Sequence, residues 1–177
     1  KNKIIDGGQI CAGDHVLGLA SSGLHANGYS LARVIVDRSG ASLNTPIAGA
    51  TLGEVLLAPT RIYVRSILNL LEKITVRGIA HITGGGLPGN IPRVLPDGLG
   101  CHIDATAWAC PEIFEWLRSE GSVTDTEMWR TFNCGIGLII IVPPEDTDQT
   151  QKMLAASGET VYPIGEIKTG HAGVVFE

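Results

Sequence analysis

Lysine and arginine form no cluster in this sequence, and no apolar run approaches the length of a membrane span. The net charge is −5 and the isoelectric point is near 5.5, which argues against a nucleic-acid-binding surface. The longest apolar run, residues 136–142, is far shorter than the roughly 20 residues that a transmembrane helix needs. No charged-then-apolar secretory segment opens the chain. We therefore expect a soluble, cytoplasmic protein.

Cysteine and methionine are also scarce. The four cysteines occur singly, and none has a partner at the spacing of a zinc site. So few cysteines in 177 residues argue against a disulfide framework, and no paired carboxylates suggest another metal site. Cys134 has no neighbour in sequence that would activate it as a nucleophile. Because residue 1 is lysine and the only methionines are Met128 and Met153, we expect the chain to be part of a longer protein.

Strand and helix patterns alternate along a chain whose hydrophobic content of 44% suits one domain, residues 1–177. Strands are expected at residues 16–20, 79–83, 99–104, 135–142, 160–167 and 174–177. Helices are expected at residues 28–38, with Asn27 as N-cap and Gly40 as stop, and at residues 60–73, 111–118, 124–131 and 145–156. Residues 39–51 are expected to form a turn-rich loop. The pattern indicates a sheet covered by helices.

The most informative segment is residues 81–93, HITGGGLPGNIPR. A strand-like run leads into Gly84, Gly85 and Gly86, and Pro92 suits the first turn of a helix. Three residues without Cβ atoms let successive amides turn toward one point, and a helix start adds donors. With a hydroxyl from Thr83 and a guanidinium from Arg93, the segment predicts a cradle for a phosphate or carboxylate.

Two other interpretations of this segment exist. A glycine run also makes a plain tight turn. Gly84, Gly86 and Gly89 satisfy G-x-G-x-x-G, and Asp104 follows Gly84 by 20 residues, as in dinucleotide-binding folds. The prolines at 88, 92 and 96 limit any helix before residue 99 to about two turns, whereas the dinucleotide fold needs a full crossover helix. No P-loop ending is present either.

A second loop repeats the logic of the first. Residues 21–28, SSGLHANG, follow a buried strand and precede a helix. The hydroxyls of Ser21 and Ser22 and the amide of Asn27 could bind a phosphate or a sugar; the alternative is a structural turn. His81 borders the glycine loop and is a candidate for proton transfer, or else a structural histidine. Asn133, before the strand at 135–142, is a further candidate contact.

Several blocks together resemble aminoimidazole ribonucleotide synthetases, also called phosphoribosylformylglycinamidine cyclo-ligases. They span the chain in order: SSGLHANGYSL at 21–31, LAPTRIYV at 57–64, HITGGG at 81–86, NIPRVLP at 90–96 and TFNCGIG at 131–137. The resemblance is to the C-terminal half of that family, with residues 1–14 leading in from the other half. It implies an α+β fold, three-layer α/β/α with a mixed sheet and partly ferredoxin-like.

The resemblance also implies a function. Such enzymes use ATP to convert formylglycinamidine ribonucleotide to aminoimidazole ribonucleotide in purine biosynthesis. ATP and Mg are bound mainly by the N-terminal half, and the whole enzyme is a homodimer. On this basis we expect His81 to act in catalysis. The expected substrate contacts are Ser21, Ser22, Gly23, His25, Asn27, Thr83, Gly84, Gly85, Gly86, Asn90, Arg93 and Asn133.

Other functions fit parts of the pattern. One is a non-catalytic module that binds a phosphorylated metabolite. Another is a related ATP-dependent synthetase or kinase of the same superfamily, and a third, a nicotinamide-dependent oxidoreductase, is favoured only by the literal glycine pattern. The blocks around Asn90 and Asn133 favour the cyclo-ligase. The isolated chain is expected to be inactive, because half of a shared site cannot align ATP with a substrate.

Overall fold

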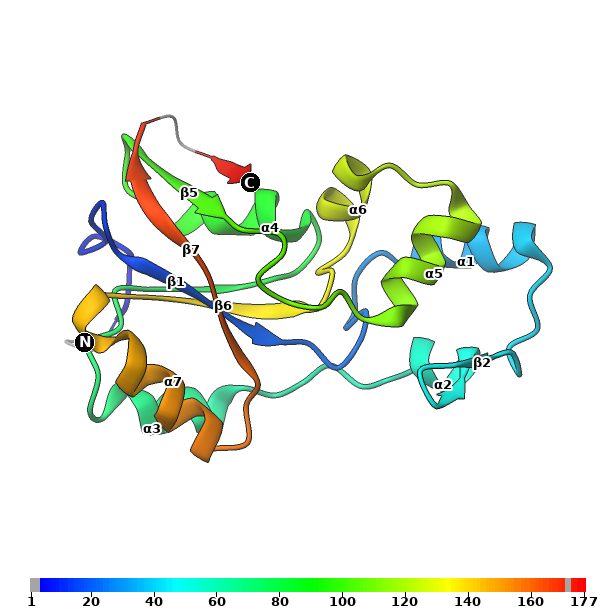
Figure 1. The fold of residues 1–177 in the computed structure, drawn as a ribbon, viewed down its shortest axis with the longest axis horizontal. Coiled ribbons are helices and arrows are strands. Elements are labelled where there is room, and N and C mark those ends of the chain that lie inside the picture. The colour runs from blue at the N-terminus through cyan, green and yellow to red at the C-terminus, as the bar shows by residue number, and fades with distance from the viewer. Residues whose placement is uncertain (1–3, 171–172) are drawn as a thin grey trace.

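A computed structural model describes residues 4–170 and 173–177 (Figure 1). Six strands form one mixed sheet in the order β4-β6-β1-β7-β5-β8. Their bounds are β1 His15–Ala20, β4 Gly78–His81, β5 Leu99–Ile103, β6 Ile136–Val142, β7 Val161–Thr169 and β8 Val174–Phe176. The β5–β8 pair is parallel, and the other neighbouring pairs are antiparallel.

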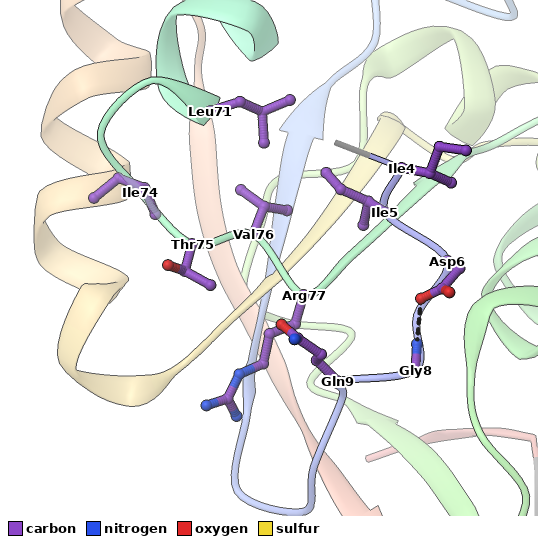
Figure 2. Close-up of a pocket in the computed structure, with 10 residues that line it drawn as sticks. All are labelled: Ile4, Ile5, Asp6, Gly8, Gln9, Leu71, Ile74, Thr75, Val76 and Arg77. Carbon is purple, nitrogen blue, oxygen red and sulfur yellow. Dashed lines mark hydrogen bonds between the residues drawn. The ribbon is translucent and has the colours of Figure 1, made fainter. Parts of the chain in front are cut away.

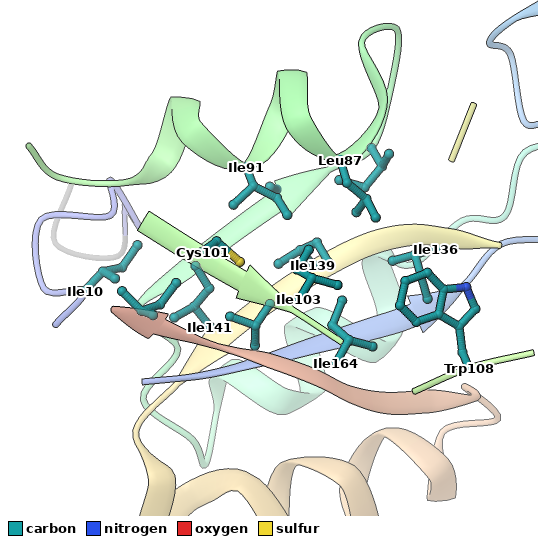
Figure 3. Packing of buried hydrophobic residues seen from close by; sticks show 14 residues of the cluster. Ile10, Leu87, Ile91, Cys101, Ile103, Trp108, Ile136, Ile139, Ile141 and Ile164 are labelled. Atoms are coloured by element: carbon teal, nitrogen blue, oxygen red, sulfur yellow. The ribbon is translucent and has the colours of Figure 1, made fainter. Parts of the chain in front are cut away.

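Helices cover both faces of this sheet (Figure 1). On one face lie α3 (Val64–Leu71) and α7 (Thr147–Ala156), the latter preceded by a 3₁₀ turn, Pro144–Asp146. On the other face lie α4 (Gly86–Asn90) and a 3₁₀ turn, η1 (Ile91–Val94). Because alternate residues of a strand point to opposite faces, β6 supplies both cores and all seven of its residues are buried. Figure 3 shows the α4 face, where Leu87 and Ile91 meet the isoleucines of the sheet.

A further group of helices lies beyond one end of the sheet (Figure 1). It comprises α1 (Tyr29–Ser39), α2 (Leu52–Leu56), α5 (Glu112–Gly121) and α6 (Asp125–Thr131), with the hairpin β2 (Pro46–Ile47) and β3 (Ala50–Thr51). The aromatic rings of Phe114 and Phe132 are fully buried at its centre, 6.0 Å apart between centroids. This group fixes the loops that lead to and from the sheet.

The three layers and the mixed sheet confirm the expected fold. Each of the six expected strands is present, and the strand expected at 135–142 lies in the sheet interior between β4 and β1. None of the described helices is both long and apolar enough to cross a membrane. Residues 39–51 were expected to form only a loop. The β2–β3 hairpin within this range and α2 directly after it were not expected. A capping box between Thr51 and Glu54 starts α2, and that pattern was present in the sequence.

Two local predictions were wrong. The helix expected from residue 60 begins at Val64, because tertiary hydrogen bonds hold residues 59–63 in a non-helical strap. Asn27 is not the N-cap of α1. That position belongs to Gly28, which has a left-handed φ of 76° and no side-chain cap. A Cβ at Gly28 would overlap the Phe132 ring, so both the conformation and the packing require glycine there.

Candidate functional site

Three loops meet at one edge of the sheet. β1 and β4 are both antiparallel to β6, which lies between them, so their carboxyl ends reach the same edge. The loop after β1 (residues 21–28), the loop after β4 (82–85) and the loop before β6 (132–135) therefore lie together. These are the three loops in which the sequence placed its candidate residues, apart from His81 on β4, Gly86 and Asn90 on α4, and Arg93 on η1.

Asn133 joins two of these loops. It is fully buried, and its Nδ2 donates to the carbonyl of Gly23 at 2.8 Å. Its Oδ1 accepts from the hydroxyl of Ser21 at 3.0 Å and from the amide of Gly135 at 2.8 Å. All of its side-chain polar atoms are thus engaged within the protein. In this structure Asn133 positions the loops.

Asn90 holds the glycine loop in position in a similar way. Its Nδ2 donates to the carbonyls of Thr83, Gly84 and Gly86 at 3.2, 3.3 and 2.8 Å. Its Oδ1 accepts from the Thr83 hydroxyl at 3.0 Å. One buried side chain therefore closes the turn from both ends, and it turns the carbonyls of the loop inward.

The three glycines differ in what they do. Gly85 and Gly86 have φ values of 99° and 58°, in the left-handed region. The amide of Gly86 donates to Thr83, and the residue is buried against α6. Among the described residues, the backbone amides of Gly84 and Gly85 have no acceptor. Gly84 is exposed, so this amide pair is the part of the loop that can receive an anion.

The Asn27 side chain of the first loop borders this amide pair. A Cβ on Gly84 would lie 3.9 Å from Oδ1 of Asn27. Ser22 is exposed and donates its hydroxyl to the Pro59 carbonyl at 2.6 Å, while Ser21 is partly exposed. The loop after β1 thus places the Asn27 amide next to the glycine loop, while the hydroxyls of Ser21 and Ser22 bond to Asn133 and Pro59.

His25 lies beneath these groups and is 3% exposed. Its Nε2 accepts from the amides of Ser22 at 3.1 Å and Arg61 at 3.4 Å, so the ring proton is on Nδ1. Nδ1 is buried and has no hydrogen-bond partner in the described part of the chain. The backbone of His25 is left-handed, with φ of 56°, a conformation that is uncommon outside glycine and often found at functional sites. Burial lowers the pKa of His25 to about 4, with smaller contributions from His81 and Arg61.

We expect His25 to make the fold acid-sensitive. Because its pKa falls from 6.5 in the unfolded chain to about 4 in the folded one, the unfolded chain binds more protons between these values. The free energy of unfolding should therefore decrease as the pH falls from 6.5 towards 4. Urea unfolding at pH 7.0 and pH 4.5 should show a smaller decrease for His25→Gln than for wild type, by about 2 kcal/mol. Equal acid sensitivity of the two proteins would contradict this.

His81 and Arg93 are placed differently. His81 is exposed at the end of β4, with its ring centroid 6.4 Å from that of His25. It therefore borders the candidate site and can reach a ligand there. Arg93 is exposed on η1, and no hydrogen bond or ion pair joins it to the glycine loop in the described part of the chain.

The strap at residues 59–63 borders the site, and sequence reasoning did not assign it a role. The Arg61 guanidinium donates from Nε to Oε2 of Glu159 at 2.7 Å and from Nη2 to the Gly158 carbonyl at 2.6 Å. Glu159 is buried and also accepts from the Ser66 hydroxyl at 2.5 Å. Tyr63 donates to the Ala20 carbonyl at 2.7 Å. These bonds hold the strap over His25.

Gly137 explains how His25 and Tyr63 fit against the sheet. A Cβ at this position would overlap the Tyr63 hydroxyl and the His25 ring. The absence of a side chain on β6 therefore lets both residues approach the strand. Asn133 and Gly137 both lie in the TFNCGIG block, so the sequence already marked this part of the chain as belonging to the site.

The thiol of Cys134 and the metal-ligating side chains complete the description of this edge of the sheet. Cys134 is buried, and its burial raises the pKa of the thiol, which disfavours the nucleophilic thiolate. Within residues 4–170 and 173–177, no three His, Cys, Asp or Glu residues are placed to hold a metal ion.

A larger cavity lies elsewhere. It has a volume of about 630 Å³ and lies between the N-terminal segment and residues 71–77, at the amino end of β4 (Figure 2). It contains none of the candidate residues. A smaller cavity of about 380 Å³ is lined by Ser21, Ser22 and Gly23 on one side and by Pro111, Glu112 and Ile113 on the other.

Curated relatives of this chain are cyclo-ligases. The chain is 53% identical over 173 residues to the phosphoribosylformylglycinamidine cyclo-ligase of Burkholderia pseudomallei (strain 1710b), covering 98% of this chain and 49% of the relative. It is 54% identical over 167 residues to that of Nitrosococcus oceani, covering 94% and 47%. The chain thus spans about half the length of these relatives.

Solved structures share the fold at lower identity. Thiamine-monophosphate kinase from Stenotrophomonas maltophilia K279a superposes with a TM-score of 0.66 at 16% identity, covering 94% of this chain and 51% of that one. The hydrogenase maturation protein HypE in complex with ATP superposes with a TM-score of 0.65 at 21% identity, covering 97% and 49%.

The family assignment rests on a match along nearly the whole chain. The sequence profile of AIR synthase related protein, C-terminal domain, matches residues 12–177. That range includes all three loops and the strap, and it confirms the resemblance seen in the sequence. The chain belongs to the family of AIR synthase related proteins, as their C-terminal domain.

Proposed function

We propose that this chain is the C-terminal domain of an ATP-dependent cyclo-ligase that converts formylglycinamidine ribonucleotide to aminoimidazole ribonucleotide in purine biosynthesis. The observation that carries the proposal is the meeting of a glycine loop with two free amides and a loop of hydroxyl and amide side chains. This arrangement suits a substrate that carries a phosphate and a ribose. The identity of 53% with a named cyclo-ligase supports the same reaction.

The candidate residues divide into two roles. The amides of Gly84 and Gly85 bind the 5′-phosphate, with Arg93 and His81 as supporting groups. The Thr83 hydroxyl, which donates to Asn90 in this structure, turns toward the phosphate when the substrate binds. Ser21, Ser22, Gly23 and Asn27 hold the ribose or the amidine end. Four buried residues position these groups without touching the substrate: His25, Gly86, Asn90 and Asn133.

ATP supplies the leaving group in this proposal. It phosphorylates the formyl-amide oxygen of the substrate, the amidine nitrogen attacks the activated carbon, and phosphate leaves as the imidazole ring closes. The products are aminoimidazole ribonucleotide, ADP and phosphate. ATP and Mg are assigned mainly to the other half of the enzyme, as the resemblance to the family implies. An ATP complex of the structurally similar HypE supports ATP use in this fold.

The proposal also places the domain within a longer enzyme. Residues 1–177 form one domain of a longer, homodimeric and cytoplasmic enzyme, with residues 1–14 leading in from the other half. The isolated chain does not turn over substrate, because binding ATP in line with the substrate requires both halves.

An amide-resolved NMR titration of the chain with formylglycinamidine ribonucleotide tests the proposal. We expect chemical-shift changes at Gly84, Gly85 and residues 21–23. With the dephosphorylated compound, the signals of Gly84 and Gly85 should not shift. Changes confined to other residues, or none at millimolar ligand, would contradict the substrate assignment. In the full-length enzyme, Arg93→Ala should raise KM for the ribonucleotide about 10-fold, the loss of roughly 1.4 kcal/mol of binding.

A further inference from the structure

A buried carboxylate anchors the strap at residues 59–63. Glu159 lies in the turn between α7 and β7, and its side chain is 4% exposed. Its Oε2 accepts from Nε of Arg61 at 2.7 Å, and its Oε1 accepts from the Ser66 hydroxyl at 2.5 Å. Arg61 also donates to the carbonyl of Gly158, the residue before Glu159. The turn therefore fixes the guanidinium of the strap through two separate hydrogen bonds.

Stability alone gives no reason for an ion pair at this position. Taking the Glu159 carboxylate out of water costs free energy, and a guanidinium that is itself 36% exposed offsets this cost only in part. A pair of apolar side chains of similar volume is often as stable as a buried ion pair, or more stable. A buried pair does hold one defined geometry, and the geometry that this pair holds is the position of the strap.

The strap is bonded in turn to the loop after β1. Three hydrogen bonds, spaced two residues apart along the strap, join it to the end of β1 and the start of the loop. They run from the Ser22 hydroxyl to the Pro59 carbonyl at 2.6 Å, from the Arg61 amide to Nε2 of His25 at 3.4 Å, and from the Tyr63 hydroxyl to the Ala20 carbonyl at 2.7 Å. His25 extends the connection, because its Nε2 also accepts from the amide of Ser22 at 3.1 Å. A displaced strap would disturb all of these bonds together.

We propose that Glu159 is a positioning residue for the loop after β1: it holds Arg61, Arg61 holds the strap, and the strap sets the position of residues 21–23. The inference rests on the proposed function, in which these residues hold the ribose or the amidine end of the ribonucleotide. Glu159 acts on the substrate only through this chain of contacts. Its loss should therefore weaken binding of the ribonucleotide and leave ATP, which is assigned mainly to the other half, nearly unaffected.

Steady-state kinetics of the full-length enzyme test this role. Glu159→Ala should raise KM for formylglycinamidine ribonucleotide about 10-fold, with kcat within about 3-fold and KM for ATP within about 2-fold of wild type. Arg61→Ala keeps the backbone amide that donates to His25 but removes the guanidinium, so it should raise the same KM to the same extent. The double variant should be no worse than either single variant, because all three remove one link.

Two further variants separate positioning from stability. Ser66→Ala removes the other hydrogen bond of the same carboxylate and leaves the pair with Arg61, so it should lower the thermal midpoint without changing KM. Glu159→Gln can still accept from Arg61 through Oε1, and its amide can donate to the Ser66 hydroxyl, so KM should return to within about 2-fold of wild type. A Ser66→Ala enzyme whose KM rises as much as that of Glu159→Ala would overturn the proposal, because the effect would then follow stability.

Nuclear magnetic resonance of the 177-residue chain supplies a readout that is independent of turnover. The ¹⁵N resonance of His25 Nε2 should move in Glu159→Ala and Arg61→Ala, because the Arg61 amide no longer donates to it. It should stay in place in Ser66→Ala and Glu159→Gln. A resonance that moves in neither of the first two variants would overturn the proposal.

The two measurements also distinguish this inference from the proposed reaction. If the His25 resonance moves as expected but the full-length enzyme forms no aminoimidazole ribonucleotide, the reaction is refuted and the link from Glu159 to the loop stands. If the enzyme forms this product and Glu159→Ala leaves KM for the ribonucleotide unchanged, the reaction stands and the positioning role is overturned.

Discussion

Gly86→Ala is expected to lower the thermal midpoint of the chain by about 10 °C, whereas Gly84→Ala, two residues earlier, should hardly change it. A Cβ at Gly86 would overlap the carbonyl oxygen of Trp129 and lie 2.8 Å from that of Phe132. Both contacts are to backbone and cannot rotate away, and the φ of 58° adds strain for any residue with a side chain. Together they should cost about 4 kcal/mol, which at roughly 2–4 °C per kcal/mol gives the expected shift.

Gly84→Ala is the matched control for this prediction. No atom lies closer than 3.9 Å to a Cβ built there, and Gly84 has no left-handed φ. Its methyl group would stand beside the free amides, so the full-length enzyme should show a KM for the ribonucleotide raised about 10-fold with little loss of stability. Thermal unfolding monitored by circular dichroism and steady-state kinetics check the pair. A stable Gly86→Ala chain would show that α6 can move away from the glycine loop.

The order of the elements along the chain could be predicted from the sequence, but the sheet order that brings the candidate loops together could not. Apolar runs such as residues 136–142 indicate buried strands, and glycine and serine clusters mark where they end. The sheet order then brings the loops after β1 and β4 to one edge. That order depends on contacts between distant residues, and no local pattern encodes it.

The sequence could not show which polar residues of the site contact a ligand and which support the backbone. Asn90 and Asn133 look like ligand contacts in the sequence, because an amide in a glycine-rich loop can serve either a ligand or the backbone. In the structure both side chains are buried and hydrogen-bonded within the chain, which favours the backbone role. Nothing in the sequence indicated a role for Glu159, because its partner Arg61 lies 98 residues away in sequence.

The predicted start of α3 was wrong for a related reason. Residues 60–63 continue the apolar periodicity of α3, and propensity alone extends the helix to them. In the structure, the Arg61 amide donates to His25 and the Tyr63 hydroxyl donates to Ala20. These tertiary bonds are worth more than a further helical turn, and they place the strap where it supports the site.

Asn133→Ala is expected to destabilise the chain by about 4 kcal/mol and to separate the loops of the site. The substitution leaves the buried Gly23 carbonyl and the buried Gly135 amide without partners, each at a cost of about 1–3 kcal/mol, and it adds a cavity. Urea unfolding measures the loss. In the full-length enzyme kcat/KM should fall about 100-fold where the variant is still folded, because the loop after β1 no longer holds its register.

Asn133→Asp distinguishes hydrogen bonding from packing at the same site. The new carboxyl group keeps the shape of asparagine and still accepts from Ser21 and Gly135, but its second oxygen faces the Gly23 carbonyl. Only the protonated acid can donate to that carbonyl, so burial and repulsion raise its pKa in the folded state above the unfolded value near 3.9. The unfolding free energy of Asn133→Asp, relative to wild type, should therefore be higher at pH 5 than at pH 8. A difference from wild type that does not change with pH would mean that Asn133 acts by filling space and that the bond to Gly23 does not hold the two loops together.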